Sequence, residues 1–515
     1  MQEERANFFA EIRRKPRGSG TRPDAPCIRI PAYGIIIKSL KRKVTRLERI
    51  RRWLARPRPG YADAVVLVIL AAGAFLLWNH PDIQETARHT RILLEDLFSG
   101  RFFDFYNDTM AGREIYGYAN AAHYHIVFYL LCALWDMPVY LLSLFLPVSD
   151  FAFVLWTKLL GVGAWAVSGL LLGKLAGKMG SPDDDAAWAP YAFWLCPIAF
   201  FTVLAMGQYD SLCLVFLLWA LLLYWDGRMP AFCLVIGAAM VFKMFALFIA
   251  IPLLLLREKR VLRLIGYGVL CLWLYLPGVL LFRGRDGDAG FFNGLIADRL
   301  FVQRLGVEAA PSLVLTLLAV LYMICWAWRP ADERSLRDKS LYVCMAAFAV
   351  LFLCVEWHPQ WLILLTPFLI LTTLSSRHRL WWLVLQVIFT ASFFVLVFYR
   401  FPTQLECNLF DFGVLGEWAG LLVSGAETMR TNTIYFDLLP YAKELASVGF
   451  AAPLLLSLAG KFPLRGVQLA DRLDRGEAVC VQPSVSVWLP FVAAFGAFWF
   501  VPTAFAWLKS LAILS

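Results

Sequence analysis

Long apolar segments recur from residue 61 to residue 508, and they restrict the fold more than any other feature of the sequence. A segment of ~20 apolar residues is long enough to cross a bilayer as a helix. The chain is 60% hydrophobic, whereas soluble domains contain about 45–50% apolar residues. We therefore predict an all-α polytopic membrane protein with about 11–14 transmembrane helices. The candidate spans are 61–78, 123–146, 152–174, 187–206, 211–226, 229–256, 264–282, 312–328, 341–356, 361–375, 380–399, 445–460 and 486–508.

The positive charge of the chain is concentrated in its first 60 residues. That arm contains 17 Lys and Arg but only 5 Asp and Glu, a net charge of +12, whereas the whole chain carries +10. We expect the first 30 residues to be disordered, 38–58 to form a juxtamembrane helix against anionic lipid, and the N-terminus to be cytoplasmic and uncleaved. The arm accounts for the basic character, so a nucleic-acid partner is not expected.

Connections rich in Lys and Arg divide the rest of the chain into two sides. By the positive-inside rule they are cytoplasmic, and they are 174–178, 226–228, 257–263, 329–339, 377–379 and 461–477. This places Asp82, Gln208, the loop 283–311, His358 and the loop 400–444 outside. Two spans conflict with this assignment. We expect 229–256 to be a broken pair with its bend at 242–245, and 123–146 to be broken at Pro138 into a re-entrant pair.

The polar stretch 79–121 follows the first span directly. Asp82, Glu85 and His89 share one helical face, and an apolar stripe follows, so we predict one or two amphipathic helices along the outer face over 82–112. Asp82 is our candidate general base, and a capping carboxylate at a helix start is the alternative. We prefer it to Asp104 and Asp108, whose sequence context is typical of a turn.

Three further polar groups interrupt apolar sequence: Gln208 with Asp210, Lys243, and the group Glu356, His358 and Gln360. Ionisable residues in membrane segments are costly and usually functional. Each also has a structural interpretation, as a capped turn, a snorkelling lysine and a loop histidine. Together they offer a carboxylate base, cationic groups for a phosphate and aromatic faces for a sugar.

The order of these motifs resembles the GT-C glycosyltransferases, most of all the dolichyl-phosphate-glucose-dependent glucosyltransferases of N-glycan assembly and their bacterial relatives. The resemblance covers about residues 61–375 and rests on these similarities. Asp82, Glu85 and Arg88 match D-x-x-E-x-x-R; 207–210 is similar to H-F-Q-Y-N; 242–252 is similar to F-K-Q-M-A-L-Y-x-x-P; 357–365 is similar to W-H-V-H-E-K-x-I-L-L; and 294–305 is similar to the loop G-L-F-E-D-K-V-A-N-F-W. Gln360 replaces the second His of the family, Ala297 replaces the Glu before Asp298, and Tyr116 with its neighbours stands where an Asp-Tyr-Pro-Pro motif is expected.

The resemblance implies inverting transfer of a hexose from a polyprenyl-phosphate donor to an acceptor hydroxyl on the outer face. Asp82 would be the base, and Lys243 and His358 would hold the donor phosphate without a carboxylate neutralising Lys243. The other expected substrate-binding residues are Gln208, Tyr209, Asp298, Glu85, Arg88 and Gln360. No metal or cofactor is expected. The partners would be the lipid-linked donor, a lipid-linked or envelope glycan acceptor and membrane lipids, and a bacterial inner or plasma membrane is favoured over the endoplasmic reticulum.

Two other classes stay open. A transporter or lipid flippase would also place Lys and His at membrane depth, but it predicts internal repeats, which the sequence lacks. An envelope-glycan polymerase or ligase shares the chemistry but favours larger external loops. The predicted organisation is a basic arm at 1–60, a catalytic membrane module at 61–375, and C-terminal membrane helices at 376–515 that include the external loop 400–444.

Overall fold

The computed structural model describes residues 56–116, 121–283, 295–304, 311–376, 379–401, 409, 412–418, 420, 441–464, 467–468 and 482–500. All of them belong to one compact unit, Leu54–Ser515. The predicted arm 1–60 lies outside the described residues except for 56–60, as does most of the loop 400–444. The boundary at 375/376 stays a prediction.

The regular secondary structure of the described residues is helical apart from two short strands. Before residue 210 the helices are α3 (Tyr61–Leu77), α4 (Pro81–Phe98), η1 (Phe102–Asp104), α5 (Phe105–Tyr116), α6 (Ile126–Ser143), α7 (Asp150–Lys178), α8 (Asp183–Trp194), α9 (Pro197–Phe200) and the π-helical η2 (Phe201–Ala205). The middle helices are α10 (Asp210–Trp225), α11 (Met229–Phe242), α12 (Phe245–Arg257), α13 (Val261–Cys271), α14 (Tyr275–Leu281), α15 (Leu295–Val302), α16 (Leu313–Ala327), α17 (Glu333–Cys354), η3 (Pro359–Leu364) and α18 (Thr366–Leu374). The last elements are α19 (Arg379–Arg400), α21 (Val414–Glu417), α23 (Ala442–Lys461), the antiparallel strands β1 (Pro463–Leu464) and β2 (Val467–Gln468), α25 (Pro483–Pro490) and η4 (Phe491–Phe500).

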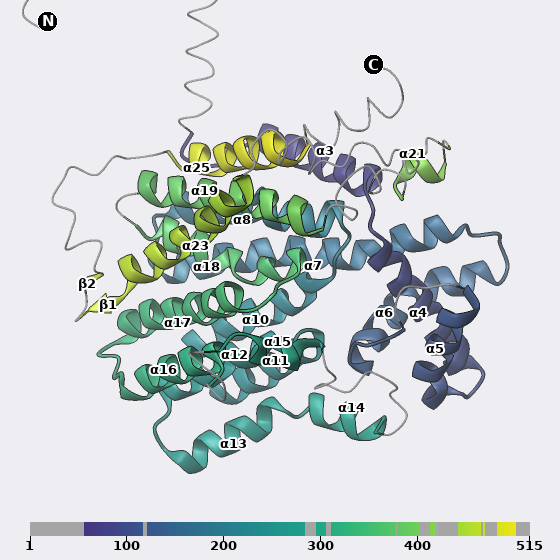
Figure 1. Ribbon diagram of the computed structural model, residues 1–515, viewed down its shortest axis with the longest axis horizontal. Coiled ribbons are helices and arrows are strands. Elements are labelled where there is room, and N and C mark those ends of the chain that lie inside the picture. Colours follow the sequence, from purple (N-terminus) through teal and green to yellow (C-terminus); the bar gives the residue numbers. More distant parts are fainter. Residues whose placement is uncertain are drawn as a thin grey trace, which may run out of the picture. The chain divides into compact units, whose positions relative to one another are not determined.

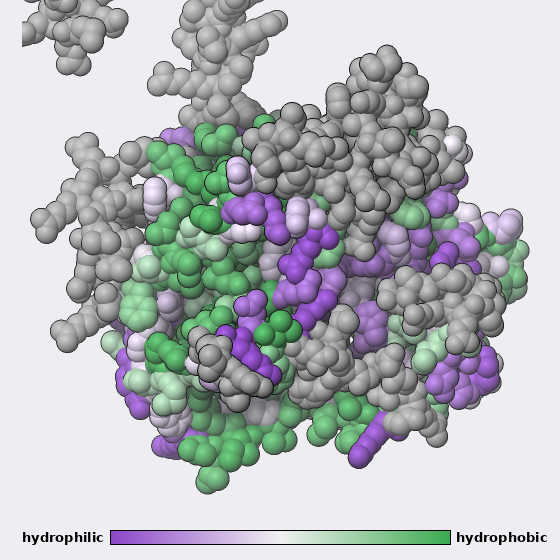
Figure 2. Space-filling model, viewed as in Figure 1, coloured by the Kyte–Doolittle hydropathy of each residue, from purple (hydrophilic) through white to green (hydrophobic). Residues whose placement is uncertain are grey.

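Four of the described helices are long and apolar enough to cross a membrane by themselves: α6, α7, α19 and α23. The number rises to 7 if each of three bent helix pairs counts as one span, and several shorter apolar helices accompany them. The hydrophobic surface over α13 and α14 is visible in Figure 2, and on α13 Leu262 is 84% exposed. The protein is therefore an α-helical membrane protein, and the count of 11–14 stays a prediction.

The basic connections meet at one end of the helix bundle. Lys178 pairs with Asp226, and Arg337 donates to the carbonyl oxygen of Lys178. Other contacts join further connections at this end: Arg257 with Glu333, Arg379 with Asp185, Lys461 with Ser376, and Arg58 with Asp184. We call this the basic end; in Figure 1 the strands β1 and β2 mark its side of the bundle. These contacts bring the basic connections together, as the charge pattern predicted. The assignment of the basic end to the cytoplasm stays a prediction.

The helices α4, α5 and α6 gather at the opposite side of the view in Figure 1. The stretch 82–112, predicted to form one or two amphipathic helices, contains α4 and α5, and Asp104 lies in the turn η1 between them. An aromatic cluster joins these helices: the ring of Tyr129 on α6 lies 5.0 Å from that of Phe105 and 5.9 Å from that of His89. The cluster fixes α4 against the bundle through packed rings.

The broken pair expected at 229–256 is confirmed as a helical hairpin. The backbone leaves the helical region at Lys243, whose φ and ψ are −154° and 120°, between α11 and α12. The C-terminal end of α12 returns to the basic end, because Arg257 donates to the carbonyl oxygen of Tyr224 at 2.6 Å. Lys243 therefore stands at the tip, at the end opposite its helix termini.

The break predicted at Pro138 is wrong, because α6 runs unbroken through it. Side chains of α7 support the turn before the proline. The indoles of Trp135 and Trp156 each donate to the other's backbone carbonyl at 2.9 Å, and Thr157 donates to the Asp136 carboxylate at 2.9 Å. Such neighbouring partners allow membrane helices to tolerate a proline.

Labelling of single cysteines tests this two-sided arrangement. Ser99 follows α4, Arg260 lies at the basic end, and both are exposed. We expect a membrane-impermeant maleimide to label Ser99→Cys from the outside of intact cells and Arg260→Cys only after permeabilisation. The parent chain, measured in parallel, gives the background from native cysteines. Labelling of both positions from the same side would contradict the arrangement.

Candidate active site

Asp82 lies in the first turn of α4, where the chain leaves α3. His80 caps this helix: its Nδ1 is 3.2 Å from the Asp82 backbone nitrogen and accepts its hydrogen when unprotonated. The same Nδ1 lies 3.3 Å from Asp82 Oδ1, to which it donates when protonated. Gln208 Nε2 donates to the other carboxylate oxygen at 2.8 Å. The cap is therefore His80, and Gln208, from a separate segment, holds the Asp82 carboxylate.

A buried lysine fixes the position of this turn. Lys158 on α7 is 1% exposed, and its ammonium donates to the carbonyl oxygens of Phe75 and Trp78, at 2.9 and 2.7 Å. A cation that binds the last carbonyls of a helix satisfies both their hydrogen bonds and the helix dipole. Lys158 thus determines where α3 ends and where Asp82 follows. Lys158 was not among the predicted site residues, although an ionisable residue within an apolar run was the signal.

Gln208 lies in a tight connection between η2 and α10, and Asp210 is the first residue of α10. Gly207 before them has φ +73°, a left-handed conformation that suits glycine. A Cβ there would lie 3.1 Å from Ile83 Cγ2 and 3.3 Å from Lys158 Cε. The backbone at Gly207 is therefore packed closely against α4 and α7. This packing directs Gln208 toward Asp82.

Lys243 and Asp210 form a buried ion pair, with Nζ 3.2 Å from Oδ1 and exposures of 7% and 2%. Lys243 Nζ also donates to Tyr124 Oη at 3.1 Å and lies 5.9 Å from the ring centroid of Trp361. The prediction that no carboxylate neutralises Lys243 is wrong. Asp210 supplies the charge because its α10 terminus packs against the hairpin tip, a contact that sequence spacing does not reveal.

His358 precedes η3, and its ring lies 5.0 Å from that of Trp361 and 5.6 Å from that of Phe401. Burial lowers the pKa of His358 to about 4, with the nearby cations Arg299 and Lys243 acting in the same direction. It interacts electrostatically with Asp82 as well, which places it in the same polar group. At neutral pH it can therefore donate through an imidazole N–H but carries no charge.

Arg299 on α15 is a site residue that was not predicted from the sequence. Its guanidinium lies 5.5 Å from the centroid of the Trp361 ring and donates to the backbone carbonyl of Glu356 at 3.2 Å. The carboxylate of Glu356 is engaged by Arg400 instead, and that hydrogen bond lowers the pKa of Glu356. Two cations, Lys243 and Arg299, thus lie beside one indole.

The remaining predicted site residues are Tyr209, Glu85, Gln360, Arg88 and Asp298. Tyr209 is buried, with ring centroids 5.2 Å from Tyr124 and 4.6 Å from Phe128, and Glu85 and Gln360 are buried too. Arg88 is exposed and interacts electrostatically with Glu417 instead of lining the polar group. Asp298 belongs to α15, but its side chain lies outside the described residues.

Several buried polar atoms of this group have no hydrogen-bond partner among the described residues: both side-chain amide atoms of Asn79, His80 Nε2, Gln208 Oε1 and the Asp210 carboxylate oxygens. Buried polar groups are almost always paired in folded proteins. Their concentration around Asp82 and Asp210 indicates a place that binds a polar ligand or water. No group of three possible metal ligands occurs among the described residues.

Comparisons of the chain with known protein families, curated proteins and solved structures found no match.

Two glycine substitutions test the close packing at Gly207. Gly100 has φ +74° and nothing within 4 Å of an added Cβ, so Gly100→Ala pays only the conformational cost of a left-handed alanine, roughly 1–2 kcal/mol. Gly207→Ala has the same conformational cost, and its added Cβ must also displace the side chains of Ile83 and Lys158. We expect Gly207→Ala to lower the thermal unfolding midpoint in detergent clearly more than Gly100→Ala. Equal shifts would mean that the connection is loosely packed.

Proposed function

We propose that the protein is an integral membrane glycosyltransferase of the GT-C type. It would move a hexose from a polyprenyl-phosphate donor to an acceptor hydroxyl on the side opposite the basic end. The observation that carries this proposal is the convergence of Asp82, Gln208 and the Lys243–Asp210 pair, from separate segments, in one partly buried polar group. The expected outer-face location and an undecaprenyl or dolichyl carrier belong to the proposal.

Asp82 is the proposed general base. Its side chain is 36% exposed, unlike the buried Asp210, so an acceptor hydroxyl can reach it. The acceptor oxygen gives its proton to Asp82 and bonds to the anomeric carbon. The bond from that carbon to the phosphate oxygen breaks, and its electron pair leaves with the lipid phosphate, so the configuration inverts. Gln208 holds Oδ2 of the carboxylate, and Oδ1, which lies beside His80, is left to accept the proton.

The donor phosphate would bind near Trp361, between Lys243 and Arg299. An ammonium has three N–H donors; Lys243 donates one of them to Tyr124 Oη, and its charge pairs with Asp210. A further N–H of Lys243 can therefore donate to the phosphate, while Asp210 balances the charge of the ammonium. Arg299 donates to a neutral carbonyl, and the nearby Glu356 carboxylate is paired with Arg400, so the guanidinium can also attract the phosphate. His358 can add an uncharged N–H donor, and charge on the leaving phosphate is stabilised by these groups.

A transporter is the second candidate, favoured by one observation. Lys243 and Asp210 lie where helices are interrupted, at the tip of a hairpin and after a π-helical segment. Substrate sites of secondary transporters are commonly built at such breaks. An uptake measurement in vesicles distinguishes the two, because a transporter moves labelled substrate without forming a new glycosidic bond.

Asp82→Asn tests the proposed base. It keeps the shape and an oxygen for Gln208 but removes the basicity, so transfer from undecaprenyl- or dolichyl-phosphate hexose should fall by roughly 10²–10⁴-fold. Expression and donor binding should stay close to those of the parent. Asp104→Asn, on an exposed turn of the same stretch, is the matched control and should retain activity. An active Asp82→Asn together with an inactive Asp104→Asn would move the assignment to Asp104.

A further inference from the structure

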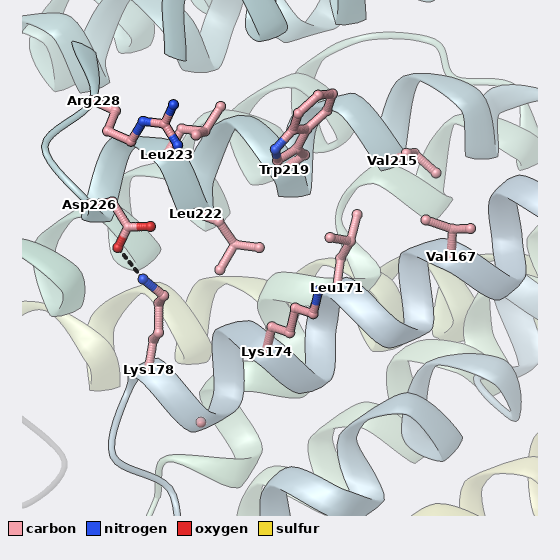
Figure 3. Close-up of a pocket in the computed structure, with 11 residues that line it drawn as sticks. Val167, Leu171, Lys174, Lys178, Val215, Trp219, Leu222, Leu223, Asp226 and Arg228 are labelled. Carbon is pink, nitrogen blue, oxygen red and sulfur yellow. Dashed lines mark hydrogen bonds and ion pairs between the residues drawn. The ribbon is translucent and has the colours of Figure 1, made fainter. Parts of the chain in front are cut away.

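A groove of about 690 Å³ lies at the basic end, between α7 and α10. Its volume is in the range of ligand pockets, ~300–1,000 Å³. In Figure 3, Val167 and Leu171 line one side, and Val215 and Trp219 face them from the other helix. Trp219 is 45% exposed and Val167 43%. The groove is therefore an open apolar channel along the surface of the bundle.

Basic side chains close one end of this channel. Lys174, Lys178 and Arg228 line it, with Asp226 as the one acidic residue among the lining side chains. Figure 3 shows that Asp226 pairs with Lys178. Neither Lys174 nor Arg228 has an ion pair among the described residues, and both are exposed. The end of the groove thus carries a net charge of +2 beside an apolar wall.

The groove is remote from the candidate active site along the same two helices. On α7, 16 positions separate Lys158 from Lys174, and the same number separates Asp210, at the start of α10, from Asp226, which caps the end of α10. At 1.5 Å per residue this is about 24 Å. A molecule whose head binds at the basic end therefore cannot place that head beside Asp82. The groove needs an explanation of its own.

We propose that this groove binds an anionic glycerophospholipid, with the phosphate at Lys174 and Arg228 and an acyl chain along Val167, Val215 and Trp219. Charge complementarity selects the occupant: two unpaired cations suit an anionic head, and an exposed apolar wall suits a hydrocarbon chain. Basic pockets between membrane helices bind such heads, and basic membrane surfaces attract anionic lipid by electrostatics. Trp is also favoured where apolar chains meet polar heads. This site is independent of the proposed transfer reaction.

Native mass spectrometry of the full-length protein in detergent tests the site. The protein is titrated with dioleoyl phosphatidylglycerol and, separately, with dioleoyl phosphatidylcholine, and the dissociation constant of the first bound lipid is measured for each. We expect tighter binding of phosphatidylglycerol. Lys174→Gln should weaken it about fivefold, the effect of one cation near a membrane surface. Asp226→Asn should strengthen it, because Lys178 is released toward the phosphate.

Arg260→Gln is the matched control, since Arg260 is an exposed cation at the same end but does not line the groove. It should leave the affinity unchanged. Equal binding of the two lipids, or equal loss in Arg260→Gln and Lys174→Gln, would overturn the proposal. Displacement of phosphatidylglycerol by millimolar inorganic phosphate would show that the groove recognises only the phosphate group and not the acyl chain. This result would overturn the lipid assignment.

Discussion

The buried Lys243–Asp210 ion pair is the interaction on which the candidate site depends. It ties the start of α10 to the tip of the α11–α12 hairpin, two places where the backbone leaves a regular helix. Two charges withdrawn from water are costly unless they are paired and hydrogen-bonded. Tyr124, just before α6, accepts a hydrogen bond from Lys243, so three segments are held in one arrangement. Gln208, two residues before Asp210, is thereby set in place to reach Asp82.

The two ends of the bundle follow from the same constraint on charge. Charged groups collect where helices end, because a bilayer interior does not solvate them. The basic connections bind one another through Lys178, Asp226 and Arg337, while the candidate active site occupies the opposite ends of α7 and α10. The two helices therefore separate two environments, a polar site around Asp82 and a basic groove around Lys174.

The sequence predicted the class of fold, the grouping of the loops and the hairpin at Lys243. These depend on local composition and on charge, which a single sequence displays directly. It also identified Asp82, Gln208 and His358 as polar interruptions. It did not reveal that Asp210 neutralises Lys243 or that Arg299 lies against Trp361, because both contacts join segments distant in the chain. The continuity of α6 at Pro138 depends on the indole of Trp156 on another helix, so it was equally hidden.

A double-mutant cycle on Lys243 and Asp210, read by unfolding in detergent, tests this account most directly. Lys243→Met and Asp210→Asn each leave a buried polar partner unmatched, so each should destabilise strongly, by roughly 3–5 kcal/mol when one partner of a buried pair is lost. The double variant should recover much of that loss but should not bind the polyprenyl-phosphate donor as the parent does. Additive losses without recovery, or single variants as stable as the parent, would contradict the claim that this pair holds the site together.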